Sequence, residues 1–448
     1  MDYKIWISYH KPELAERYGL RNDEHHFCFP TYIAPTEQNI NHLNPILSEM
    51  VTMWYVWKNN LRSEYVGFNH YRRRFNVCRM PKDNECQIWK IRDFGREAIY
   101  QQYVRVHGHS DIDLLLSILD YKYGRGNDYA THIRVSHRMV MACCFLMSWD
   151  NFVKLCEFLF PTLAEVALQS GCKYDIQAWR ERAKAKFGKD KADYQMRVLS
   201  FLAERLISAW ITTHLTPYQQ KDVAIIHYNT PEITEALVKS IRKHTSNIDI
   251  TILDNSDSKP YVNDGSVTIL DNTKGRLIDF DALINKYPDR IPTACNWGSE
   301  KHIASVDYLF DKLPCGFVLL DSDTLVKNDL SPLFDPECCF IGMQEKQHYW
   351  FQRERLAPYL MWINTLECKA NGVRFWHDGR AYKLSHGQAP YYDTGCSFWE
   401  DCKAARLKGR YINIYDYIEH LGGASCKEEP EKAKQWLEQH KELWEDTI

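Results

Sequence analysis

The strongest chemical signal in the sequence is an acidic triplet, Asp321, Ser322 and Asp323, inside the stretch "GFVLLDSDTLV". The apolar run before the triplet predicts a buried strand, and two carboxylates at positions i and i+2 of a strand end can converge on one divalent cation. A Mg²⁺ or Mn²⁺ held in this way keeps coordination positions for the oxygens of a diphosphate. A solvated acidic turn is the competing interpretation of the triplet taken alone.

A basic segment in the first half carries the opposite charge at a similar position. The stretch "EYVGFNHYRRRF", residues 64–75, predicts a buried strand that ends in His70 and Tyr71 and is followed by Arg72 and Arg73. Arginine side chains bind phosphate oxygens in a bidentate manner and can offset the charge of a leaving diphosphate without a metal. The competing interpretation is a surface cluster that pairs with acids elsewhere.

The composition indicates a globular protein of two domains. The chain has 448 residues, 45% of them hydrophobic and 26% charged, which is more than one ordinary hydrophobic core accommodates. The net charge of −3 argues against nucleic acid as the main partner. The first 220 residues hold 29 Lys and Arg against 24 Asp and Glu, and the remainder holds 27 against 35, so each motif lies in the half whose charge it shares.

Strands that alternate with helices in both halves predict α/β domains with mostly parallel sheets, whose ligands bind beyond the carboxyl ends of the strands. A boundary is expected within residues 212–221, between a helix-like run and the apolar strand "VAIIHY", which gives domains 1–215 and 221–448. Three segments of the first half are each predicted to form one element: a helix over 44–60, a strand over 140–148 and a closing helix over 194–211.

Targeting signals and cysteine spacing point to a cytoplasmic protein. The first residues, "MDYKIWISYH", lack the basic start and apolar run of a signal peptide, and "MVMACCFLMSW" is too short to span a bilayer. The 15 cysteines include no CxxC pair, so we expect reduced thiols and no disulfides. The basic stretch "WRERAKAKFGKDKAD" suggests peripheral association with the inner face of the cytoplasmic membrane, although a solvated helix face is its ordinary interpretation.

The second half resembles the nucleotide-sugar glycosyltransferases of the GT-A fold, particularly the family 2-like group. The resemblance rests on "HYNTPE", "LDNSD" and "LLDSD" in this order and covers most of residues 221–425. It implies a UDP-sugar donor and a Mn²⁺ or Mg²⁺ ion on Asp321, Asp323 and His420. The donor contacts that it implies are Asp254, Asn255, Lys274, Arg276, Lys301, His302, Asp321 and Asp323. Asp393 or Asp401, in "YYDTGCSFWEDC", is the candidate general base at the acceptor hydroxyl.

The first half resembles the family described as domain of unknown function 4422, found among capsular and O-antigen polysaccharide glycosyltransferases. The blocks "ISYHKP", "NINHLNPILSEMVTMWYVWKN", "YVGFNHYRRRF", "VHGHSDID" and "FLAERL" carry this resemblance over roughly residues 3–215. Asn69 is a small departure, since the family more often has Cys before His-Tyr-Arg-Arg. The resemblance implies His70 and Glu49 as catalytic residues and, as donor contacts, His10, Lys11, Tyr71, Arg72, Arg73, Glu204 and Arg205.

The sequence as a whole predicts two GT-A-like (Rossmann-like) domains in tandem. The expected protein is a bifunctional enzyme of bacterial capsule or O-antigen synthesis that moves sugars from UDP-sugar donors to a lipid-linked oligosaccharide or polysaccharide acceptor. Some relatives of the first half look like galactofuranosyltransferases, so UDP-galactofuranose is a candidate donor there, with no cofactor expected. The second domain is expected to transfer a hexosyl or N-acetylhexosaminyl group.

The sequence leaves two alternative functions and one alternative metal site open. The first domain can be a non-catalytic glycan-binding module, since it lacks Asp-x-Asp. A sugar nucleotidyltransferase would need a glycine-rich loop with a lysine after its first strand, and neither "HKPELAERYG" nor "HYNTPEITE" supplies one. His107, His109 and Asp111, in "HGHSD", are spaced so that they can hold a metal, but ordinary hydrogen bonds of a loop are favoured.

Overall fold

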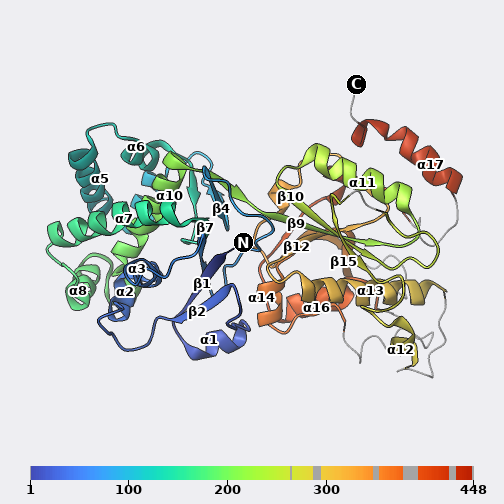
Figure 1. Ribbon diagram of the computed structural model, residues 1–448, viewed down its shortest axis with the longest axis horizontal. Coiled ribbons are helices and arrows are strands. Elements are labelled where there is room, and N and C mark those ends of the chain that lie inside the picture. The colour runs from blue at the N-terminus through green and yellow to red at the C-terminus, as the bar shows by residue number, and fades with distance from the viewer. Residues whose placement is uncertain are drawn as a thin grey trace. The chain divides into compact units, whose positions relative to one another are not determined.

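The computed structural model describes residues 2–262, 265–285, 294–346, 353–376, 392–422 and 430–445. The chain forms two compact units, Met1–Gln220 and Lys221–Ile448, each built around one main sheet with helices packed on it (Figure 1). Most strand pairings within each main sheet are parallel. This arrangement confirms the predicted α/β class with mostly parallel sheets.

The main sheet of the first unit has six strands in the order β2-β1-β3-β7-β4-β8. These strands are β1 (Tyr3–Tyr9), β2 (His26–Pro30), β3 (Tyr65–His70), β4 (Glu85–Ile88), β7 (Phe145–Ser148) and β8 (Thr216–Gln219), with β5 (Ile91–Asp93) and β6 (Arg138–Val140) as a separate pair. The central strands β1 and β3 are parallel, and Ser8 pairs with His70. The sequences that follow these two strands therefore meet at one end of the sheet.

The helices of the first unit supply most of its apolar core. They are α1 (Pro12–Arg17), α2 (Asn44–Leu47), α3 (Met50–Lys58), α4 (Ile99–His107), α5 (Ser110–Tyr123), α6 (Asp128–Val135), α7 (Trp149–Gln169), α8 (Ile176–Phe187), α9 (Lys189–Gln195) and α10 (Val198–His214). Val66 and Phe68 of β3 belong to the large core cluster with these helices, whereas Ile5 and Ile7 of β1 belong to a second, smaller cluster. The central strands are thus buried on both faces.

The predicted single helix over 44–60 is wrong, because the chain breaks between α2 and α3. Ser48 has a φ of 47° and a ψ of −130°, a conformation that a helix cannot contain and that non-glycine residues seldom adopt. Ser48 is nevertheless buried. Pattern alone could not show this break, since the apolar spacing continues through it.

Two other elements of the first unit are also interrupted. The predicted strand over 140–148 divides at Ala142 and Cys143, whose φ values of 68° and 53° make a turn before β7 begins. The predicted closing helix over 194–211 is two helices, with α9 ending at Gln195 and α10 beginning at Val198. The breaks at Ser48 and between α9 and α10 lie beside residues of the site described below.

The main sheet of the second unit has seven strands in the order β11-β10-β9-β12-β15-β14-β16. They are β9 (Lys221–His227), β10 (Ile248–Asp254), β11 (Thr268–Asp271), β12 (Phe317–Asp321), β14 (Phe340–Glu345), β15 (Arg355–Ile363) and β16 (Gly409–Tyr411). β13 (Thr324–Val326) and β17 (Ile418–His420) form a separate two-stranded ladder. Because β11, β10, β9 and β12 are parallel, Asp271, Asp254, His227 and Asp321 end at the same edge.

The helices of the second unit cover both faces of its sheet (Figure 1). They are α11 (Pro231–His244), α12 (Phe280–Asn285), α13 (Ala294–Lys312), α14 (Thr365–Ala370), α16 (Cys396–Ala404) and α17 (Pro430–Gln439). Alternate residues of β12 separate into two core clusters: Phe317 and Leu319 in one, Val318 and Leu320 in the other. Among the helices of the described residues, none is both long and apolar enough to cross a bilayer.

Candidate active sites

An acidic cluster lies at the carboxyl end of β12 in the second unit. Asp321 is the last residue of β12, and the ladder of β13 with β17 places His420 opposite Thr324, next to Asp323. One ligand atom from each of Asp321, Asp323 and His420 lies within 4.8 Å of the other two. The His420 Nε2 is 3.3 Å from Asp323 Oδ1. The three residues that the sequence proposed as metal ligands are therefore together in space.

The interior of this cluster leaves a buried oxygen without a hydrogen-bond partner. The Asp321 Oδ1 lies 3.1 Å from His302 Nε2, an ion-pair distance, but makes no aligned hydrogen bond. Burial opposes the charging of His302, yet the carboxylates of Asp321 and Asp393 outweigh it and raise the pKa of His302. Two carboxylates and one imidazole suit Mn²⁺ or Mg²⁺, and a buried carboxylate oxygen without an aligned hydrogen bond can bind such a cation.

Asp393 is connected to the acidic cluster through Arg355 and His302. Arg355, at the start of β15, forms ion pairs with Asp393 and, at 2.6 Å, with Glu345. Its Nη2 donates to Tyr359, whose ring centroid lies 4.1 Å from that of His420. The His302 Nδ1 lies 2.8 Å from the hydroxyl oxygen of Thr394, the residue after Asp393. Arg355 belongs to no recognisable sequence motif, so the sequence analysis did not identify it.

Asp401, the second candidate for the base, lies elsewhere. Its carboxylate accepts a 3.5 Å hydrogen bond from the backbone N–H of Arg374, which itself forms an ion pair with Asp307 at 2.6 Å. The neighbouring Glu400 binds Arg353 at 3.0 Å. Of the two proposed acceptor-side carboxylates, the structure thus joins Asp393 and not Asp401 to the acidic cluster.

The two proposed donor contacts at the end of β10, Asp254 and Asn255, each make hydrogen bonds to other groups of the protein. Both oxygens of the buried Asp254 carboxylate accept backbone N–H groups, from Ser256 at 2.9 Å and Tyr261 at 2.8 Å. The Asn255 side-chain amide donates to the Ser305 hydroxyl at 2.9 Å and accepts from the Asn272 amide at 2.8 Å. Asp254 therefore shapes the loop after β10, and Asn272 is a buried member of this network that sequence reasoning missed.

The three proposed basic donor contacts occupy two elements. Lys274 and Arg276 are exposed in the turn after β11, on the edge of the sheet where the parallel strands end. Lys301 precedes His302 on α13, and its Nζ lies 5.4 Å from the ring centroid of Phe280. These side chains remain candidates for the nucleotide of a donor.

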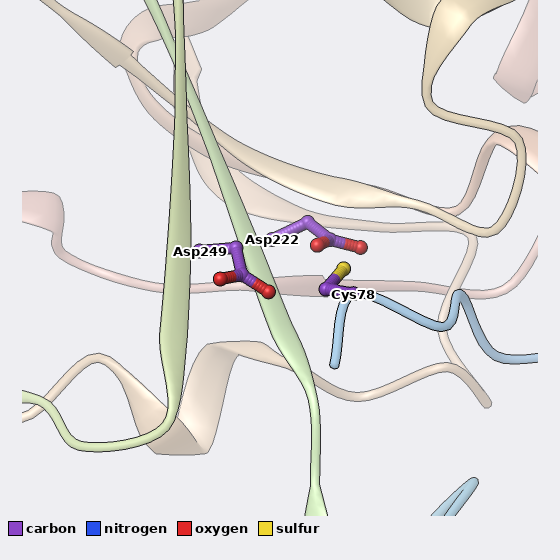
Figure 2. Close-up of side chains that lie close together, drawn as sticks. All are labelled: Cys78, Asp222 and Asp249. Atoms are coloured by element: carbon purple, nitrogen blue, oxygen red, sulfur yellow. The ribbon is translucent and has the colours of Figure 1, made fainter. Parts of the chain in front are cut away.

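A second pair of carboxylates lies at the opposite end of the same strands. Figure 2 shows Asp222 and Asp249 side by side on β9 and β10, where the register pairs them. Cys78, also labelled in the figure, belongs to the first unit. Each aspartate precedes the carboxyl end of its strand by about 16 Å, at about 3.3 Å per residue. The pair lies away from the edge where ligands of such sheets bind.

The basic cluster of the first unit is built at the carboxyl ends of β1 and β3. His70 and Arg73 exchange backbone hydrogen bonds of 3.0 Å in both directions, and Tyr71 N donates to Ser8 O at 3.1 Å. This turn fixes Arg72 and Arg73 at the strand end. The ring of Tyr71 contacts that of His10, with centroids 5.6 Å apart. His10, which precedes Lys11, therefore lies beside the His-Tyr-Arg-Arg segment, and their role as one site stays a prediction.

Glu49 and His70 form the core of this site. Glu49 follows the strained Ser48, and its Oε1 lies 3.5 Å from His70 Nε2. The His70 side chain is buried, and its Nδ1 has no hydrogen-bond partner. Burial, and then the positive charges of Arg73 and Arg72, hold the pKa of His70 well below its usual range. His70 is therefore neutral near pH 7.

Glu204 and Arg205, the remaining proposed donor contacts of the first unit, lie on α10. Burial raises the pKa of Glu204, although Arg205 opposes that shift and its Nη1 lies 3.2 Å from the Glu204 carboxylate. Arg205 also donates to Phe201 O at 2.9 Å and to Gln102 Oε1 at 2.7 Å, and is almost fully buried. Because Nη1 and Nη2 already donate to protein groups and Nε is buried, Arg205 is placed to hold Glu204 rather than a donor phosphate.

The alternative metal site in "HGHSD" is not assembled. The His107 Nδ1 lies 2.8 Å from Gln195 Oε1, whereas His109 pairs with Asp113 at 3.0 Å. Asp111 forms an ion pair with Arg182 at 2.5 Å. The three side chains bind different partners, so these residues make ordinary contacts, although His107 ends α4 and Asp111 lies in α5 instead of a loop.

Asn69 supplies a stability prediction. Its amide is buried on β3, and neither its oxygen nor its nitrogen has a hydrogen-bond partner. An unsatisfied buried amide costs about 1–3 kcal/mol. We expect Asn69→Leu, of similar volume, to raise the free energy of unfolding of the first unit by about that amount, measured by chemical denaturation. A less stable Asn69→Leu variant would show that the amide has a buried partner, and Asn69→Asp should destabilise in either case.

The comparisons with known proteins find one family and several distant structures. Residues 31–94 and 79–215 match the family described as "Domain of unknown function (DUF4422)". The chain is similar to the apo structure of the bifunctional glycosyltransferase WbbM, with 16% identity, 92% of this chain and 87% of that chain covered, and a TM-score of 0.34.

Two further structures resemble the chain over less of its length. An active-site mutant of LgtC is 14% identical, with 43% of this chain and 73% of that chain covered and a TM-score of 0.28. The glycosyltransferase GlyE of Streptococcus pneumoniae is 13% identical, with coverages of 44% and 46% and a TM-score of 0.25. No curated protein sequence matches the chain. The likeness is distant at these TM-scores, so the chemistry of the two sites has to carry the functional conclusion.

Proposed function

We propose that the protein is a bifunctional glycosyltransferase of bacterial surface polysaccharide synthesis, with one transferase in each unit. The observation that carries the proposal is the meeting of Asp321, Asp323 and His420 at the carboxyl end of β12, with ligand atoms within 4.8 Å of one another. The resemblance of the first half to polysaccharide glycosyltransferases and of the second half to nucleotide-sugar glycosyltransferases supports the same conclusion. UDP-sugars are the proposed donors and a lipid-linked oligosaccharide or polysaccharide the acceptor.

The second unit would hold Mn²⁺ or Mg²⁺ on Asp321, Asp323 and His420. Such an ion, when bound, neutralises negative charge on a leaving diphosphate. Asp393 is the candidate to take the proton of the acceptor hydroxyl, and its ion pair with Arg355 holds that carboxylate in position. His302 spans the distance from Asp321 to the Asp393 loop and so keeps the two parts of the site in register. The transferred group is proposed to be a hexosyl or N-acetylhexosaminyl group.

The first unit would act without a metal. Arg72 and Arg73 supply the positive charge at the strand end, where they can bind the leaving diphosphate. His70 and Glu49, whose Nε2 and Oε1 lie 3.5 Å apart, are the candidate pair to take the proton of an acceptor hydroxyl. UDP-galactofuranose is the proposed donor, which follows from the resemblance alone.

Chelation should separate the two activities. In excess EDTA we expect second-unit transfer to be lost and first-unit transfer to persist at about its full rate, because only the second unit is proposed to use a metal. UDP release from each donor, measured on the full chain, checks both arms. Return of the second activity on addition of Mn²⁺ is the control, and loss of the first activity in EDTA would contradict the metal-free assignment.

Two other functions predict different results in the same assay. A first unit that only binds glycan would release no UDP from any donor and would leave all turnover sensitive to EDTA. A sugar nucleotidyltransferase would release pyrophosphate from a nucleoside triphosphate instead of UDP from a UDP-sugar. UDP release that survives EDTA and requires an acceptor would exclude both.

A further inference from the structure

Arg197 lies at the site of the first unit although no motif of the sequence assigns it a role. It occupies the break between α9 and α10, and its Nε and Nη2 lie 3.1 and 2.6 Å from the Ser48 hydroxyl oxygen. Ser48 is the strained residue that directly precedes Glu49, which in turn lies 3.5 Å from His70. A residue 149 positions away in sequence from Ser48 is thus fixed next to the proposed catalytic pair.

The positive charge of Arg197 is not neutralised by the protein. Among the described residues, no carboxylate lies within 4.0 Å of its guanidinium, and the same is true of Lys11, Arg72 and Arg73. Burial lowers the pKa of His10, and Lys11 and Arg197 lower it further. Arg197 also lowers the pKa of the buried His70. The site therefore gathers cations from three separate segments of the chain with too few acids to balance them.

Such an arrangement is unfavourable unless an anion enters it. Like charges in a partly buried region repel one another, and a guanidinium that is half-buried has lost part of its hydration. The Ser48 hydroxyl oxygen accepts hydrogen bonds from Nε and Nη2 of Arg197, and these two bonds fix the plane of the guanidinium. Nη1 is then the nitrogen that can bind a ligand. A fixed guanidinium that keeps free donors matches phosphate oxygens well.

We propose that Arg197 is a third arginine of the anion site in the first unit, where it binds the diphosphate of a nucleotide-sugar donor together with Arg72 and Arg73. This inference rests on the proposed function and extends it. It also gives the strained Ser48 a purpose, because a regular helix through residue 48 would not aim that hydroxyl at Arg197 and the next side chain at His70. The simpler alternative is that Arg197 only ties α10 to the α2–α3 junction.

The experiment uses calorimetric titration of the full chain with UDP and with inorganic pyrophosphate, in EDTA. An Asp321→Asn, Asp323→Asn background removes the proposed metal site of the second unit. Three variants are compared in it: Arg197→Ala, Arg197→Lys and, as a matched control, Arg180→Ala. Arg180 belongs to an exposed ion pair with Asp193 in the same unit. Thermal unfolding of each variant reports separately on a structural tie.

Arg197→Ala is expected to weaken the binding of both probes by about 10- to 100-fold, the range for losing charge-assisted hydrogen bonds. Arg197→Lys should give an intermediate dissociation constant, and Arg180→Ala should bind as the background does. If Arg197→Ala binds both probes normally and only unfolds at a lower temperature, the residue is a structural tie and the inference fails while the proposed function stands. If the background itself binds neither probe in EDTA, the inference and metal-free transfer in the first unit both fail.

Discussion

Asp321→Asn is expected to lower sugar transfer by the second unit about 1,000-fold and to leave transfer by the first unit unchanged. The substitution keeps the shape of the side chain but removes the negative charge that Asp321 contributes to the cluster with Asp323 and His420. Loss of roughly 4 kcal/mol of transition-state stabilisation corresponds to that factor. Titration with Mn²⁺ should show that the variant no longer binds the ion at the wild-type affinity.

A matched control for this prediction lies on the same edge of the same sheet. Asp271 ends β11 and is exposed, with its carboxylate hydrogen-bonded to Thr273. Asp271→Asn should retain activity and Mn²⁺ affinity, because that carboxylate is outside the cluster of three. Full second-unit activity in the Asp321→Asn variant would remove the metal assignment, and loss of both activities would point to misfolding.

Arg72→Ala combined with Arg73→Ala should lower transfer by the first unit about 150- to 25,000-fold at unchanged second-unit activity. Each arginine lost removes a charge-assisted contact with the diphosphate that is worth about 1.5–3 kcal/mol. Because the leaving group is affected more than ground-state binding, we expect kcat to fall more than KM rises. UDP release in EDTA measures the first unit alone.

The third arginine of the same run provides the control. The Arg74 Nη2 donates to Tyr18 O at 2.9 Å, which directs this side chain into the fold instead of the site. Arg74→Ala should therefore lower the melting temperature of the first unit and keep most of its turnover. Equal losses of turnover from Arg74→Ala and from the double variant would mean that the run supports the fold and binds no donor.

The sequence was sufficient for the class of fold and for the ends of the central strands. Apolar runs that stop at a charged residue, such as β12 at Asp321 and β3 at His70, are visible in the pattern because burial ends where charge begins. The breaks at Ser48 and at Ala142 and Cys143 are not visible, nor is the break at Met196 and Arg197. Positive φ values at non-glycine residues depend on contacts with distant segments, and a local pattern contains no trace of them.

The same distinction applies to the candidate sites. By itself the sequence determined that there are two charged strand ends, one acidic and one basic, because residue type and position in a strand suffice for that conclusion. Only the tertiary structure decided which of Asp393 and Asp401 joins the acidic cluster, and that Arg355 and Arg197 lie at the two sites. The physical reason is that a side chain's partners come from chain segments far away in sequence, and packing alone fixes which of them meet.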